Sequence, residues 1–202
     1  MAFNPAMSRK LVLRDQVDAS SVRAVAEESG WAYVGQIKAD PESGTCYEVK
    51  WETENGTAVH YIVDDFVGMA YLVAMNENRE AAEDVIDHAA EALPCWSVAE
   101  MLIEAGTHVY PADWARALLR LGVGAPSHPM ESVVSMIRAG TRHRDADVRT
   151  AAAWSMAYAE WPDFLETLDQ LAQTDEDPAV CQAAASALAE FRAAGGELHR
   201  PE

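Results

Sequence analysis

Hydrophobic and polar positions along this chain follow a strand-like period of two in its first half. Tyr47, Val49 and Trp51 alternate with charged residues and therefore share one face of an expected strand. A second apolar run covers 58–63, after a turn that contains Asn55-Gly56. Two such runs joined by an Asn-Gly turn predict a β-hairpin.

The rest of the first half mixes short strands with helices. Ser20 or Ser21 is suited to cap a helix that ends before Gly30, and Pro94 ends a second helix. The pattern therefore predicts a small α+β domain over 1–94 with a β-meander. Its further elements are strands near 10–14, 31–37 and 70–74, and helices near 20–28 and 78–93.

From Trp96 onward the apolar positions recur at helical spacing. Prolines and aspartates such as Pro111, Asp113, Pro162 and Asp163 stand at the expected helix starts, where they satisfy or replace free amides. Because the connections are short, neighbouring helices should run antiparallel. We therefore expect an all-helical domain over 95–202. Its helices are expected near 97–105, 112–121, 130–139, 146–160, 162–172 and 178–194.

Two of these helical segments repeat each other at a spacing of 32 residues. The hydrophobic pattern of residues 148–156 matches that of 180–188, and each copy follows an acidic turn, at 145–147 and 175–177. A fixed period of this length indicates stacked supersecondary units. Such stacks usually present a binding surface.

Over residues 113–191 the sequence resembles HEAT repeats in their short bacterial form. The resemblance is carried by Asp145-Ala-Asp-Val-Arg149 with the alanines that follow, and by Asp177-Pro-Ala-Val180 in the next copy. It implies a curved layer of helical hairpins that contacts a protein partner. It also implies that Asp147 and Arg149 form a polar ladder between repeats. Cys181 takes the place of the arginine in the last copy, so the ladder is expected to end there.

The net charge of −18 narrows the classes of partner. Acidic residues are spread along the whole chain, and such a charge repels nucleic acid and anionic membranes. It would attract a basic protein, although solubility alone also explains it. The three cysteines lack metal-ligand spacing, and no secretory or membrane-spanning run is evident, so we expect a cytoplasmic protein.

The sequence predicts no catalytic, metal-binding or cofactor-binding residues. His88 and Asp84 stand at helical i,i+4 spacing, which a surface pair explains, and Asp64-Asp65 reads as a solvated strand end. No serine lies in a nucleophile-elbow motif, and no glycine pattern resembles a phosphate-binding loop. Gly122-Val-Gly124 is interpreted as a helix terminator and turn.

The expected partner surface lies on the second helices of the hairpins. Trp154, Tyr158 and Trp161 fall on one helical stripe, which is either core between repeats or an aromatic contact for a partner. The polar candidates lie on or next to the expected second helices near 130–139 and 162–172. They are either partner contacts or part of a solvated helix face. The candidate partner-binding residues are Glu131, Ser135, Arg138, Trp161, Glu166, Asp169, Gln170 and Gln173.

Three functions remain open at this point. The favoured one is a non-catalytic interaction module, a HEAT-like scaffold or adaptor that binds another protein. The alternative is an acidic immunity or antitoxin-like inhibitor of a basic partner. The third is an enzyme whose site would need carboxylates to converge with His60 or His108.

Overall fold

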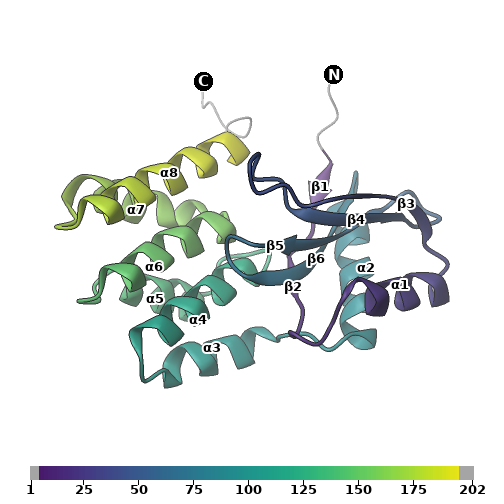
Figure 1. The fold of residues 1–202 in the computed structure, drawn as a ribbon, viewed down its shortest axis with the longest axis horizontal. Helices are drawn as coiled ribbons and strands as arrows, with labels where there is room; N and C mark the ends of the chain where they lie inside the picture. Colours follow the sequence, from purple (N-terminus) through teal and green to yellow (C-terminus); the bar gives the residue numbers. More distant parts are fainter. Residues whose placement is uncertain (1–4, 196–202) are drawn as a thin grey trace. The chain divides into compact units, whose positions relative to one another are not determined.

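A computed structural model describes residues 5–195 of the chain. The chain divides into two compact units, the first ending at Trp96 and the second beginning at Ser97. The first unit holds the strands and two helices, whereas the second is helical (Figure 1). The expected fold class, a small antiparallel sheet with helices followed by an all-helical stack, is therefore confirmed.

Within residues 5–195, six strands form one antiparallel sheet in the first unit. Its order is β1-β6-β5-β4-β3, and β2 also pairs with β6, so β3 to β6 form the expected meander. The strands are β1 (Ala6–Met7), β2 (Leu11–Val12), β3 (Ala32–Ile37), β4 (Tyr47–Glu52), β5 (Ala58–Asp64) and β6 (Met69–Asn76).

The hairpin of β4 and β5 has the register that the alternating pattern predicts. Trp51 lies opposite Val59, and Val49 lies opposite Tyr61. All four side chains are buried in the same core, which confirms the assignment of faces. Gly56 closes the turn with a φ of 75°, a left-handed conformation that glycine adopts without steric cost.

Two helices cover this face of the sheet. The helix α1 (Ala19–Glu28) contributes Val22, and α2 (Arg79–Ala92) contributes Ile86, both fully buried with the sheet residues. The cap of α1 differs from the expectation. Asp18 accepts a hydrogen bond from the backbone N–H of Ser21 at 2.9 Å, so α1 begins earlier than a serine cap would allow. An aspartate there satisfies the free amide as a serine would.

The second unit is built from consecutive helices with short connections. Pro111 begins one of them, and Ser97 forms a reciprocal capping box with Glu100 at the start of another. The elements are α3 (Val98–Thr107), α4 (Pro111–Val123), α5 (Glu131–Gly140), α6 (Ala146–Ala159), a short 3-10 helix η1 (Pro162–Phe164), α7 (Leu165–Thr174) and α8 (Pro178–Gly195).

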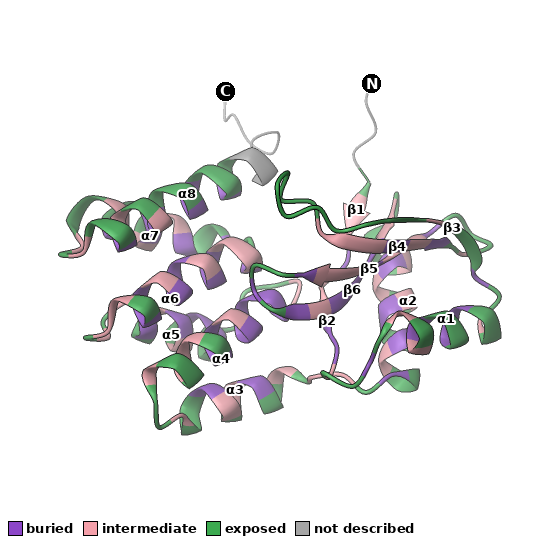
Figure 2. Ribbon diagram, viewed as in Figure 1, coloured by how far each residue is buried: buried purple, intermediate pink, exposed green. Residues whose placement is uncertain are grey.

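The first helices of the repeats stack directly on one another, α4 on α6 and α6 on α8. Ala152 and Ala153 on α6 are fully buried and permit close packing. Figure 2 shows buried positions along this helix. Gly122 lies inside α4, and a Cβ there would come within 2.5 Å of the backbone of Ser155 on α6. The interpretation of Gly122 as a terminator was therefore wrong. Gly124 caps α4, and Gly122 serves helix packing.

Candidate interaction surface on the helical repeats

Arg149, near the start of α6, makes hydrogen bonds from three of its side-chain nitrogens. Its Nε and Nη2 donate to the two carboxylate oxygens of Asp175 at 2.8 and 2.9 Å. Its Nη1 donates to the carbonyl oxygens of His143 and Arg144 at 2.9 and 3.2 Å. A bidentate pair of this kind is both strong and directional.

Burial and charge reinforce the pair. The side chains of Arg149 and Asp175 are 7% and 5% exposed. Hydrogen bonding to Asp175 raises the pKa of Arg149, and hydrogen bonding to Arg149 lowers the pKa of Asp175. Asp175 stands in the turn before α8, so the pair ties one repeat to the next.

The partner of Arg149 is thus Asp175, whereas the ladder implied by the family resemblance named Asp147. Asp147 is exposed in the first turn of α6, where its backbone N–H donates to the Asp145 carboxylate at 3.0 Å. In the sequence, the acidic turn at 175–177 was noted only as the start of the second repeat copy. Its position one repeat after Arg149 was the signal that could have identified Asp175.

Cys181 lies in α8 at the position that Arg149 has in α6. Its Sγ donates to the carbonyl oxygen of Asp175 at 3.3 Å. Asp177, which precedes α8, accepts from the backbone N–H of Ala179 at 2.8 Å. The turn before α8 is therefore fixed by side chains of α6 and α8 and by its own cap.

A polar groove of about 760 Å³ lies beside this pair, between α5, the turn that follows it, and α7. Three of the residues expected to bind a partner, Arg138, Glu166 and Gln170, line it. The remaining lining comes mainly from the turn after α5 and from the end of α7. These residues are Thr141, Arg142, His143, Arg144, Arg149, Thr167, Leu171, Thr174, Asp175 and Glu176.

Four other expected partner-binding residues lie exposed on the second helices but outside the groove lining. On α5, Ser135 donates to Glu131 at 3.0 Å, and on α7, Gln173 donates to Asp169 at 2.7 Å. These i,i+4 bonds are those of a solvated helix face. The four residues remain accessible, since each is exposed in the structure.

Trp161 was expected on the partner-binding surface, but the structure does not place it there. The helix α6 ends at Ala159, where Glu160 adopts a left-handed conformation with a φ of 56°. The chain therefore leaves the helical stripe before Trp161, whose side chain is 3% exposed. Its Nε1 donates to the carbonyl oxygen of Pro126 at 3.1 Å, and its ring stacks on Phe164. Trp161 is a core residue.

The first unit contains one serine–histidine pair that the sequence did not reveal. Ser29 Oγ and His88 Nε2 lie 2.8 Å apart, and the His88 ring meets Trp31 edge-on. Catalytic use of such a pair needs a third group that orients the histidine. Among the described side chains, no hydrogen bond joins Asp84 to His88, so the geometry supplies no triad.

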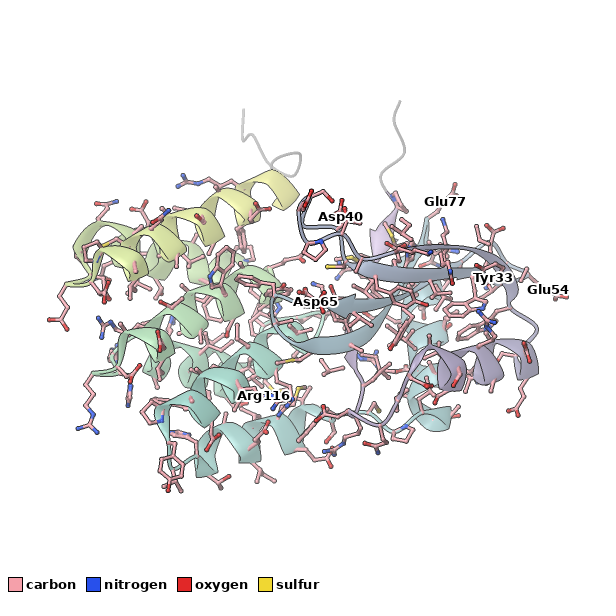
Figure 3. The ribbon with its side chains drawn as sticks, in the orientation of Figure 1. Tyr33, Asp40, Glu54, Asp65, Glu77 and Arg116 are labelled. Carbon is pink, nitrogen blue, oxygen red and sulfur yellow. The ribbon has the colours of Figure 1, made fainter. Side chains whose placement is uncertain are left out.

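The other candidate positions have structural roles. Asp64 is 5% exposed and accepts from the backbone N–H groups of Phe66 and Val67, so it closes the β5–β6 turn and is not a solvated strand end. Asp65 beside it is exposed (Figure 3). His60 bonds to Glu48 at 2.6 Å, and His108 stacks on Trp114. Residues 5–195 contain no cluster of three potential metal ligands.

Comparison with known proteins supports the repeat assignment. A model of HEAT repeats matches residues 134–197, which include most of α5 and all of α6 and α7. No curated protein and no solved structure matches the chain. The second unit therefore contains HEAT-like repeats. Among the described helices, none is long and apolar enough to span a membrane.

Proposed function

We propose that this chain is a non-catalytic protein-interaction module, a HEAT-like scaffold or adaptor that acts in the bacterial cytoplasm. The observation that carries the proposal is the stack of HEAT-like hairpins whose second helices, α5 and α7, present exposed polar side chains beside a groove. Stacked repeats of this kind generally use such a surface to bind another protein. Nucleic acid and anionic membranes are unfavourable partners for a chain of charge −18.

The proposal is tested by affinity capture of partners from the native host with the tagged full-length chain. Ser135→Arg on α5 and Gln173→Arg on α7 each place a long cation on the proposed surface. Ser186→Arg makes the same change at an exposed position of α8, a first helix, and is the matched control. A partner bound by the wild type and the control should be reduced about tenfold or more by either surface variant.

Two results would contradict the proposed interaction surface or the module itself. A partner that binds both surface variants as well as it binds the wild type does not use the second helices. If purified chain retains no protein at low or high salt, the module proposal is wrong.

An acidic inhibitor of the immunity or antitoxin type is the second candidate, because the charge of −18 would steer a basic protein toward the chain. The same capture distinguishes the two functions by salt. Steered binding of a single basic protein should weaken strongly as ionic strength rises, since exposed charges are screened beyond about 8 Å at physiological salt. A salt-resistant assembly favours the scaffold.

A further inference from the structure

Four of the chain's 15 lysines and arginines line the one groove described above. Arg138 comes from α5, Arg142 and Arg144 from the turn after it, and Arg149 from α6. We call this feature the arginine groove. A concentration of cations is unexpected in a chain whose net charge is −18.

The fold uses only part of this positive charge. Arg149 is neutralised by Asp175, and Arg138 donates from Nη2 to the carbonyl oxygen of Asp163 at 2.6 Å. Arg142 and Arg144 are exposed, and the structure records no hydrogen bond or ion pair for their side chains among the described residues. The guanidinium donors of Arg142 and Arg144 are thus left for a ligand.

The facing wall does not cancel these cations. Beyond the neutralised Asp175, it offers Glu166 and Glu176, both exposed. Glu176 approaches Arg149 at 3.6 Å and so already belongs to that pair. The lining therefore keeps a local positive excess. Exposed charges are screened beyond about 8 Å at physiological salt, so a short ligand in the groove responds mainly to the charges that lie beside it.

The remaining lining suits a peptide. Gln170 and Thr167 on α7 carry amide and hydroxyl groups for which no bond is recorded among the described residues. These groups can bond to peptide backbone, whereas guanidinium groups bind carboxylates with matching geometry. A long polyanion such as nucleic acid would extend over the acidic surface and be repelled.

We propose that the arginine groove binds an acidic segment of a partner protein, with Arg142 and Arg144 contacting its carboxylates. This inference rests on the proposed function and specifies which chemistry the helical surface recognises. It concerns the charge of the docked segment, so the partner as a whole is free to be acidic, neutral or basic.

Binding of a fluorescein-labelled hexaglutamate peptide to the purified full-length chain is measured by fluorescence anisotropy at physiological salt, where exposed charges are screened beyond about 8 Å. Hexaglutamine of the same length is the uncharged comparison. The double variant Arg142→Gln/Arg144→Gln should weaken hexaglutamate binding about fivefold to tenfold, since each exposed charge pair contributes up to about a factor of five. Arg192→Gln, an exposed arginine of α8 outside the groove, is the matched control and should bind as the wild type does.

A variant that is expected to bind more tightly separates an effect on binding from misfolding, because a misfolded protein would not gain affinity. Glu166→Gln removes a carboxylate from the groove wall and should tighten hexaglutamate binding about twofold. The inference is overturned if Arg192→Gln weakens binding as much as the double variant, or if hexaglutamine binds equally well. It is also overturned if inorganic phosphate or a short oligonucleotide displaces the peptide at a lower concentration than free hexaglutamate does, because the groove would then select phosphate.

The arginine groove and the proposed interaction function can fail independently, and different results identify each failure. If peptide binding follows the arginines but no partner is captured, only the module proposal fails. If a partner is captured equally by the wild type and the double variant, and hexaglutamate does not bind, only the groove assignment fails.

Discussion

The buried pair of Arg149 and Asp175 is one of the contacts that link two successive repeats. Removing one member leaves the other charge in a site where it is almost inaccessible to solvent. The cost of such an uncompensated charge usually exceeds the net stabilisation that the intact pair provides. We therefore expect this contact to be more sensitive to substitution than any exposed ion pair of the chain.

Arg149→Ala should lower the free energy of unfolding by about 3 kcal/mol. Arg144→Ala is a suitable comparison, because its side chain is exposed and should change that free energy by less than about 0.5 kcal/mol. Urea unfolding followed by circular dichroism measures both. Equal stability of Arg149→Ala and the wild type would show that the pair does not hold the repeats together.

The pH dependence of the free energy of unfolding is a second test of the pair of Arg149 and Asp175. The pKa of Asp175 lies below its ordinary value of 3.8, chiefly because Arg149 hydrogen bonds to it. A carboxyl group with a lowered pKa stabilises the fold above its ordinary pKa, and this contribution is lost as pH falls through the folded pKa. The stability difference between wild type and Asp175→Asn should therefore be constant near neutral pH and shrink below about pH 4.

At the scale of the elements, the contact of α4 with α6 depends on one glycine. Gly122→Ala would bring a Cβ within 2.5 Å of the Ser155 backbone, so one helix must move away from the other. Gly106→Ala on α3 meets only the Met136 side-chain end at 3.9 Å and is the matched control.

We expect Gly122→Ala to destabilise the chain by about 3 kcal/mol, since forced overpacking typically costs 1–3 kcal/mol and backbone yields less than side chains. Gly106→Ala should be neutral or stabilising by about 0.5 kcal/mol, because alanine loses less entropy in a helix. Thermal unfolding of both variants gives the comparison. A Gly122→Ala protein that melts with the wild type would contradict the close approach.

The elements that the sequence predicts well are those with a local signal. Alternation around Trp51 defines the hairpin, and a proline or an acidic cap marks the start of α4 and α8. The end of α6 carries no such signal, because Glu160 enters the left-handed region without the glycine that usually permits it. The stripe through Trp161 was therefore extended too far.

In the candidate surface, too, some placements have a local sequence signal and others do not. Residues on one helix, such as Ser135 and Glu131, could be assigned to a common face from their spacing. The arginine groove could not, because it combines α5, the following turn and α7. The pairing of Arg149 with Asp175 spans 26 residues and depends on the stacking of one repeat on the next. Spacing along a chain cannot specify which turn meets which helix.

At the scale of the whole molecule, we expect each of the two compact units to fold independently. The core of the first unit is formed by residues from Leu11 to Leu93, with helices and strands in one cluster. In the second, successive first helices pack on one another, as repeat proteins stabilise themselves through neighbouring repeats. We therefore infer two folding domains, with the boundary near 96.

Expressed separately, fragments 1–96 and 97–202 should each unfold cooperatively and retain the circular dichroism of a folded chain. Tryptophan emission checks each fragment by itself, because Trp51 is 1% exposed in the first unit and Trp161 is 3% exposed in the second. Burial of these rings in a folded core keeps their emission blue-shifted, whereas unfolding exposes them to water. An emission maximum of a solvated indole in either fragment, with the full-length chain blue-shifted, would mean that this unit requires the rest of the chain. The compact units would then be parts of one cooperative fold.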